Sequence, residues 1–125
     1  YANVYYATDK TLAENQDVVA RYLKACARGW GYAKDNQEEA VDLLVAEYPN
    51  LDKKAEMEAV GSVINFSFGP STKENGWGAM TKDNWQNQID IYAKLDQFKG
   101  AVPKVDDVMT LAILDATKEI RMQVG

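Results

Sequence analysis

Apolar and polar positions follow two different patterns along this chain, and the change comes near residue 10. Residues 3–8 are rich in β-branched and aromatic side chains, which predicts a short strand. Beyond them, apolar side chains recur at intervals of about three or four residues, the spacing of amphipathic helices. A lone strand cannot satisfy its own backbone donors and acceptors, so we expect it to pair with a strand outside this chain. The pattern therefore indicates a fragment of a larger fold.

Residues that cap and stop helices divide the rest of the chain into about five helices. Thr11 and Glu14 have the spacing of a capping box, so the first helix is expected to begin near residue 11 or 15 and to end between residues 29 and 36. Asn36 and Asp52 are expected to cap the second and third helices. Pro49 is expected to stop the second helix.

The second half of the chain is predicted to contain one long loop, at residues 71–80, and two further helices. The fourth helix begins after Thr81 and ends at Gly100, and it has the clearest apolar stripe in the chain. A fifth helix is expected over residues 106–121, after an extended connector at Pro103. The predicted fold class is therefore mainly α, with about five helices after one short N-terminal strand.

Composition and charge limit the classes of partner. The chain has 125 residues, of which 46% are hydrophobic and 26% charged, so we expect one folded domain rather than a disordered segment. Its net charge of -5 is spread along the sequence with no basic stripe, which argues against a nucleic-acid partner. No apolar run reaches the roughly 20 residues of a membrane span. No signal peptide is recognisable in this chain.

The single cysteine and the absence of histidine restrict the chemistry further. Cys26 lies on the apolar face of the first predicted helix, where a free cysteine is expected to fill the core. A Cys-His dyad or a Ser-His-Asp triad would lack its histidine base in this chain. Zinc sites that contain histidine are excluded by composition. The composition does not exclude catalysis by carboxylates or by lysine. We predict no catalytic residue, no metal and no cofactor, and hence a protein that is not an enzyme.

Several segments carry a resemblance to a known family. They are residues 4–15, 18–25, 28–30 and 38–44, together with 77–78, 85–86 and 89–91. Over nearly the whole chain they resemble the C-terminal portion of solute-binding proteins of nitrate/sulfonate/taurine-type ABC importers. That superfamily also contains the thiamine-pyrimidine precursor synthases. The similarity consists of many ordinary positions rather than one catalytic motif, and Gln16 stands where the family often has proline.

The resemblance implies the C-terminal part of a two-lobe α/β fold of the type II periplasmic-binding-protein kind. Residues 1–125 would form a single fragment, with a hinge-type strand at 1–10 and the helical part of one lobe at 11–125. It further implies capture of a small anionic or heteroaromatic solute between two lobes and delivery to an ABC permease in the membrane. The implied location is periplasmic, or extracellular and membrane-anchored.

Three aromatic residues are candidates for ligand binding. Tyr5 and Tyr6 are neighbours on the predicted strand, so they face opposite sides and either could reach the cleft. Trp77 lies between two glycines in the predicted loop, where it could stack on a planar ligand. In the alternative interpretation, the tyrosines pack on neighbouring strands and the tryptophan covers the core. Asp9 and Lys10 could pair with ligand charge or simply be exposed turn residues.

Two alternatives to the receptor stay open at this point. One is a fragment of a pyrimidine-precursor synthase-like enzyme, whose cysteine- and histidine-bearing segments would lie upstream of this sequence. The other is a free-standing helical interaction domain. The fragment hypothesis also predicts self-association, because apolar faces would lack their usual cover, and light scattering would detect it. It predicts weak solute binding or none, because half of the cleft would be missing.

Overall fold

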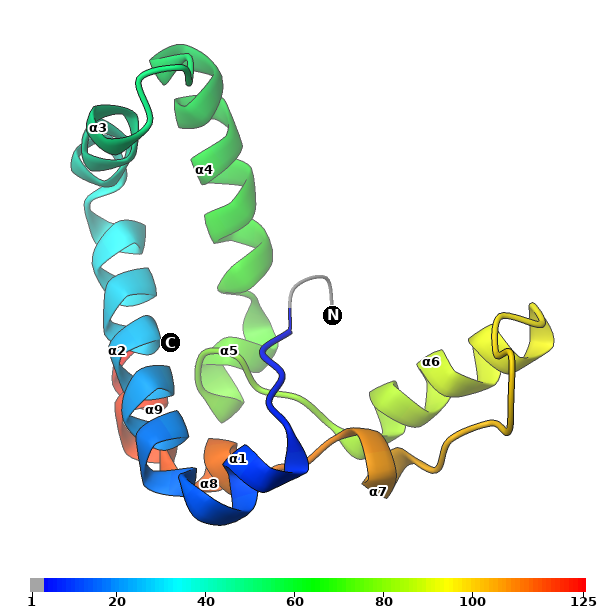
Figure 1. Cartoon of the computed structure of the whole chain (residues 1–125). Helices are drawn as coiled ribbons and strands as arrows, with labels where there is room; N and C mark the ends of the chain where they lie inside the picture. Colours follow the sequence, from blue (N-terminus) through cyan, green and yellow to red (C-terminus); the bar gives the residue numbers. More distant parts are fainter. Residues whose placement is uncertain (1–3) are drawn as a thin grey trace.

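The protein is mainly α-helical, as predicted from the sequence. The computed structural model describes residues 4–125, and within that range it contains nine helices and no strand (Figure 1). The helices are α1 (Asp9–Glu14), α2 (Gln16–Asp35), α3 (Gln37–Glu47), α4 (Lys53–Ser67), α5 (Pro70–Asn75), α6 (Lys82–Lys94), α7 (Val105–Val108), α8 (Ala112–Ala116) and α9 (Lys118–Val124).

The predicted N-terminal strand does not form in the described residues. Residues 4–8 run into α1 without regular secondary structure, and Thr8 at their end has an extended backbone, with φ −72° and ψ 154°. A strand is stabilised by hydrogen bonds to a neighbouring strand, and the described part of the chain supplies none. Asn3, where the predicted strand begins, lies outside the described residues. The proposed role of this segment as a hinge stays a prediction.

The first predicted helix is divided in two. The Thr8 hydroxyl, rather than Thr11, caps α1, because it accepts a hydrogen bond of 3.1 Å from the Thr11 backbone N–H. The chain leaves helical geometry at Asn15, where φ is −135°, and α2 follows directly. Of the two expected starts, residue 15 matches α2, whereas residue 11 lies inside α1, which is an additional short helix.

The cap predicted for the third helix and the start predicted for the fourth are confirmed. Asp52 Oδ1 accepts a hydrogen bond of 2.8 Å from the Ala55 N–H at the start of α4. The Thr81 hydroxyl accepts one of 3.2 Å from the Asn84 N–H at the start of α6. Asn36 precedes α3 as expected, but its side chain bonds back to the preceding helix instead of capping the next one.

Three boundaries in the second half differ from the prediction. The loop expected at residues 71–80 begins with α5, because Pro70 occupies the first helical turn, where its fixed φ suits a helix. Helix α6 ends at Lys94 rather than near Gly100, and the chain turns at Asp96, which has a positive φ of 53°. The helix expected over 106–121 is three short helices instead.

Local backbone geometry explains the division of that last helix. Met109 is extended, with φ −146° and ψ 153°, and it ends α7. The Thr117 hydroxyl donates a hydrogen bond of 2.7 Å to the Ile113 carbonyl between α8 and α9. A threonine that bonds back to the preceding turn competes with the helical pattern and often bends the chain.

A small core lies where α8, α9 and the loop after α5 pack against α2. Its buried members are Leu23, Ala27, Trp77, Ile113 and Leu114. Helices α2 and α4 extend from this region as two long limbs, and α3 joins them at the far end (Figure 1). The core therefore depends on residues from both ends of the sequence.

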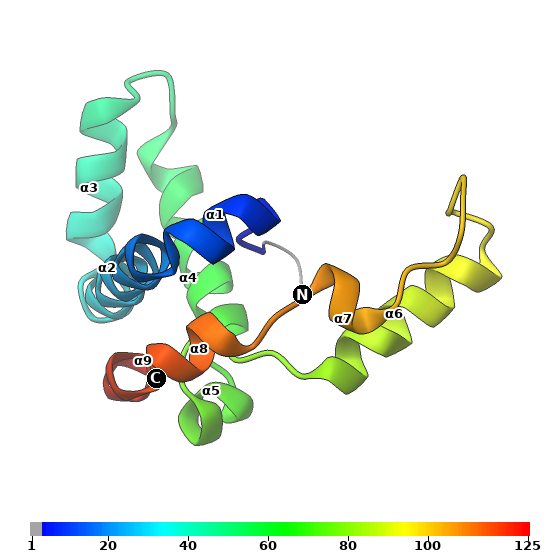
Figure 2. The same ribbon diagram turned by 60° about the horizontal axis from the view of Figure 1, so that its bottom comes forward.

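Helices α6 and α7 form an arm that extends away from the other helices in both views (Figures 1 and 2). Helix α6 packs chiefly against α7, and Lys82 is paired with Asp106 across this contact. Ile89 is the buried residue of α6. Among the described residues, no helix combines the length and apolar character needed to cross a membrane.

Candidate functional site

Four aromatic side chains gather beside the core, and we call Tyr5, Tyr22, Trp30 and Trp77 the aromatic cluster. The Tyr5 ring meets the Tyr22 ring edge-on, with centroids 5.8 Å apart and an interplanar angle of 85°. Tyr5 also lies 6.5 Å from Trp77, and Trp77 stacks on Trp30 at 6.4 Å with an angle of 26°. These separations are in the range of favourable aromatic pairs.

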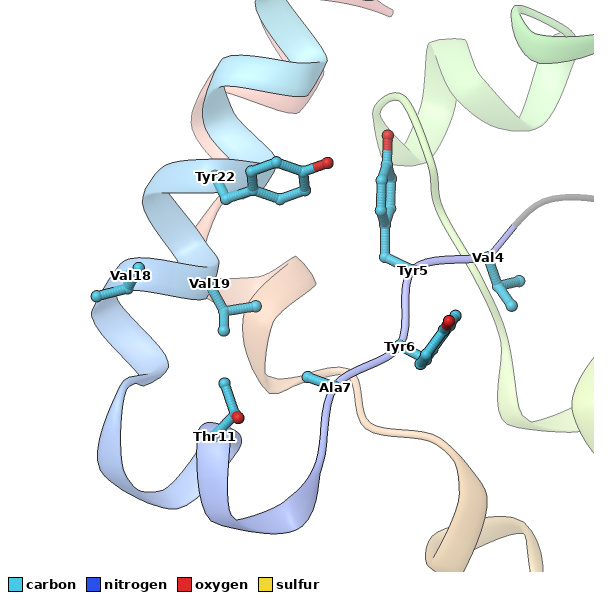
Figure 3. A pocket seen from close by; sticks show the side chains of 8 residues that line it. All are labelled: Val4, Tyr5, Tyr6, Ala7, Thr11, Val18, Val19 and Tyr22. Atoms are coloured by element: carbon cyan, nitrogen blue, oxygen red, sulfur yellow. The ribbon is translucent and has the colours of Figure 1, made fainter.

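Three separate segments supply the members of the cluster. Tyr22 and Trp30 are eight residues apart on α2, so about two turns of helix place them on one face. Tyr5 comes from the segment before α1, which folds back along α2 (Figure 3). Trp77 comes from the turn after α5, next to two glycines with positive φ.

An open hollow of about 510 Å³ lies beside Tyr5 (Figure 3). Its lining consists of Val4, Tyr5, Tyr6, Ala7, Thr11, Val18, Val19 and Tyr22. Figure 3 shows Val19 and Tyr22 pointing from α2 toward the segment that carries Tyr5, whereas the Tyr6 ring points away from α2. None of the lining side chains carries a charge at neutral pH. The hollow therefore offers ring faces and methyl groups.

The hydroxyl groups of the cluster titrate unusually. Burial raises the pKa of Tyr5 to about 12, and the neighbouring Cys26 thiol adds to the rise. The Cys26 thiol is also the main cause of a raised pKa at Tyr22. Cys26 is half-buried and packs against the core, in line with its prediction as core filler. Both phenols therefore keep their protons well above neutral pH.

The three predicted ligand residues differ in position and in exposure. Tyr5 and Trp77 come together, although 72 residues separate them in sequence. Tyr6 lines the same hollow but is 95% exposed and takes no part in the cluster. Trp77 is only 7% exposed and belongs to the core, so its structural role as a core residue is clear.

Two members of the cluster were missed as ligand candidates by sequence reasoning. Tyr22 and Trp30 recur at helical spacing with other apolar residues of α2, and that pattern predicts a buried helix stripe rather than a ligand site. Tyr22 is in fact 58% exposed. The only signal for a site was the presence of two large aromatics on one helix face, and that pattern is equally typical of a core.

A second hollow, of about 460 Å³, lies between α2, α3 and α4. Its lining is apolar except for Glu56 and includes Trp30 and Cys26, so it borders the aromatic cluster. Within residues 4–125, no group of three or more histidine, cysteine, aspartate or glutamate side chains is arranged to hold a metal ion.

One family model matches this chain. Residues 1–40 match the family described as NMT1/THI5 like. The matched stretch contains Tyr5, Tyr22 and Trp30, and it supports the resemblance at the level of the superfamily. Neither a curated protein nor a solved structure matches the chain.

Proposed function

We propose that this chain belongs to a solute-binding protein of the ABC-importer type and forms part of the wall of its binding cleft. The observation that carries the proposal is the position of the aromatic cluster. Three of its four members lie in the segment that matches the NMT1/THI5-like family model, and two of them line an open hollow. Aromatic walls of this kind are common in sites for small molecules.

The lining of the hollow favours one of the two ligand classes expected from the resemblance. A small anion such as nitrate or a sulfonate is usually held by a cationic side chain or by backbone N–H groups at a helix N-terminus. The hollow beside Tyr5 has no cationic lining residue. Tyr5 and Tyr22 offer ring faces and phenol hydroxyls, which suit a planar heteroaromatic solute. We therefore propose a heteroaromatic ligand.

The remaining parts of the proposal follow from the resemblance alone. In such receptors the solute is captured between two lobes, and closure presents a changed surface to a membrane permease. We propose an ABC permease as the partner, and a periplasmic or membrane-anchored extracellular location. Self-association of the isolated chain stays a prediction.

An enzyme is the second candidate, because the matching family model also covers THI5-like proteins. A pyrimidine-precursor synthase would require a segment with histidine and cysteine, and this sequence has no histidine. The coding sequence upstream of residue 1 distinguishes the two functions. An export signal there supports the receptor, whereas a histidine- and cysteine-bearing catalytic segment supports the enzyme.

The ligand class can be tested by NMR titration with cytosine as the heteroaromatic probe and with taurine and nitrate as the anions. We expect cytosine to shift the ring signals of Tyr5 and Tyr22 at high concentration, because an incomplete cleft binds weakly. Taurine and nitrate should leave these signals unchanged. Tyr22→Ala should abolish the cytosine response.

Tyr92→Ala is the matched control for this titration. Tyr92 on the arm is 47% exposed, against 58% for Tyr22, and it lies outside the aromatic cluster. The control variant should respond to cytosine like the unmodified protein. An equal response in Tyr22→Ala, or shifts of the same size with taurine, would contradict the proposed ligand class.

A further inference from the structure

Arg121 on α9 is the buried charged residue of the described chain, and only 3% of its surface is exposed. Its guanidinium donates to neutral acceptors: Nη2 to the Leu114 carbonyl at 2.8 Å and Nε to the Thr117 hydroxyl at 3.2 Å. None of the ion pairs among residues 4–125 involves it. A buried cation is costly unless its hydrogen bonds are well made, so this geometry constrains whatever Arg121 contacts.

The backbone of Trp77 is bonded to Arg121 on both sides. The Trp77 N–H donates to the Arg121 carbonyl at 2.9 Å, and the Trp77 carbonyl accepts from Arg121 Nη1 at 2.8 Å. The Asn75 carbonyl accepts a longer bond of 3.4 Å from the same Nη1. One arginine therefore satisfies both polar groups of the Trp77 backbone and connects α9 to the turn after α5.

Gly76 shows how closely this turn approaches α9. Its φ is +85°, and a Cβ at this position would lie 3.0 Å from the Arg121 carbonyl carbon. That distance is tighter than most Cβ contacts in proteins, so α9 would have to shift, and the positive φ would strain a residue other than glycine. The turn is therefore held against Arg121 by two hydrogen bonds and by contact.

The Trp77 ring links this connection to the aromatic cluster. It stacks on Trp30 at 6.4 Å and lies 6.5 Å from Tyr5. We propose that Arg121 is the positioning residue of the aromatic cluster, because it holds the Trp77 backbone where the ring can meet Trp30 and Tyr5. The consequence for ligand binding rests on the function proposed above, whereas the geometric role does not.

The planar fork of arginine is what this role requires. Nη1 and Nη2 donate in fixed directions to Trp77 and Leu114, which belong to different segments. A lysine at position 121 would place one ammonium group where the fork now spans two carbonyls. Arg121→Lys should therefore keep the positive charge but lose the paired hydrogen bonds to the Trp77 and Leu114 carbonyls. Arg121→Met should lose the charge and these hydrogen bonds.

The test uses near-UV circular dichroism, which reports the coupling of the stacked Trp30 and Trp77 rings. Both Arg121→Lys and Arg121→Met should lose the coupled tryptophan signal while their far-UV helical signal is kept. In a background that carries both Trp30→Phe and Trp77→Phe, neither tryptophan of the cluster remains, so Arg121→Lys should change the tryptophan signal no further. Ile64→Val is the control, because it removes one methylene group from a buried residue of α4 that lies outside the aromatic cluster.

An unchanged tryptophan signal in folded Arg121→Lys overturns the positioning role. So does an equal loss in Ile64→Val, or a further loss of tryptophan signal in the background that carries both Trp30→Phe and Trp77→Phe. If neither Arg121 variant folds, hydrogen exchange of the unmodified protein decides. The Trp77 amide should be as protected as the amides of α9, and rapid exchange of that amide overturns the proposal.

Cytosine titration separates this proposal from the function on which its second part rests. If Arg121→Lys loses both the tryptophan coupling and the cytosine response of the unmodified protein, positioning and ligand class are both supported. If the coupling is lost but the unmodified protein shows no cytosine response, the positioning role stands and the proposed ligand is wrong.

Discussion

Tyr5 is the residue at which the N-terminal segment joins the body of the protein. Its ring meets Tyr22 edge-on, and such a pair contributes about 0.5–1.5 kcal/mol beyond its buried area. Its hydroxyl group is influenced by Cys26, and burial raises its pKa to about 12 from an ordinary value of 10.0. A pKa above the ordinary value means that the folded state favours the protonated phenol.

This shift predicts a loss of stability in strong base. Between about pH 10 and 12 the unfolded state releases the Tyr5 proton while the folded state retains it, so the free energy of unfolding falls as pH rises. Because Tyr5 is 53% exposed, water screens the effect, and we expect a loss of about 1 kcal/mol or less. Urea denaturation at a series of pH values measures it.

Tyr5→Phe is the control for this pH dependence. It should flatten the fall between pH 10 and 12 without removing it, because Tyr22 and Tyr32 also have raised pKa values. The Cys26 thiol causes the rise at Tyr22, and a hydrogen bond to Glu39 causes the rise at Tyr32. Identical slopes for Tyr5→Phe and the unmodified protein would show that Tyr5 titrates normally.

Helix α2 carries two glycines whose surroundings differ sharply. Gly31 is buried, and a Cβ there would lie 2.8 Å from Val124 Cβ on α9. Gly29 is exposed, and a Cβ there would meet no atom within 4 Å. Gly31 therefore permits the close approach of α2 and α9, whereas Gly29 contributes only backbone flexibility.

The same substitution should act in opposite directions at these two positions. Gly31→Ala should lower the free energy of unfolding by about 1–3 kcal/mol, because the new methyl group overpacks the contact with α9. Gly29→Ala should raise it by about 0.5–1 kcal/mol, since alanine loses less entropy in a helix. Thermal and urea unfolding followed by circular dichroism measure both.

A second substitution tests the cause assigned to Gly31. Adding Val124→Ala to Gly31→Ala removes Val124 Cγ1, one of the two side-chain atoms with which the new methyl group collides, and leaves Cβ in place. The double variant should regain part of the lost stability, beyond the sum of the two single effects. Strict additivity would indicate that the loss at position 31 arises elsewhere.

The molecule as a whole consists of a small core and two less supported extensions. Helices α3 and α4 form one, and the arm of α6 and α7 forms the other (Figure 1). The arm is joined by few contacts to the core, and its side chains at Ile91, Tyr92 and Leu95 are about half exposed or more. Segments with few buried apolar contacts open at low free-energy cost.

The rates of backbone hydrogen exchange should therefore differ between the arm and the core. We expect backbone amides in the middle of α6, around Ile89, to exchange faster than those of α2 around Leu23 and Ala27. The reason is that α2 packs against α8 and α9 as well as α1 and α3, whereas α6 packs chiefly against α7. Mass spectrometry of peptic peptides would resolve the two helices. Equal protection would show that the arm opens only with the whole protein.

Local signals were sufficient to predict much of the helical architecture. Asp52 and Thr81 each cap a helix through a bond to a backbone N–H three residues later, so the evidence lies within four residues. Pro70 is a similar local signal for α5, and it stands directly before the segment that was predicted as a loop. The strand expected at residues 3–8 failed for a different reason, because its pairing depends on residues that are not neighbours in sequence.

The sequence alone determined where most helices begin, which side chains are apolar, and that these 125 residues supply no histidine. Tertiary structure alone decided that Trp77 stacks on Trp30 and meets Tyr5, and that Arg121 secures both sides of its backbone. Helix caps act over one turn, so their residues can be read in order along the chain. In the aromatic cluster, Trp77 lies 44 residues from Arg121 and 47 from Trp30, and Tyr5 lies 17 from Tyr22, so only packing brings these side chains together.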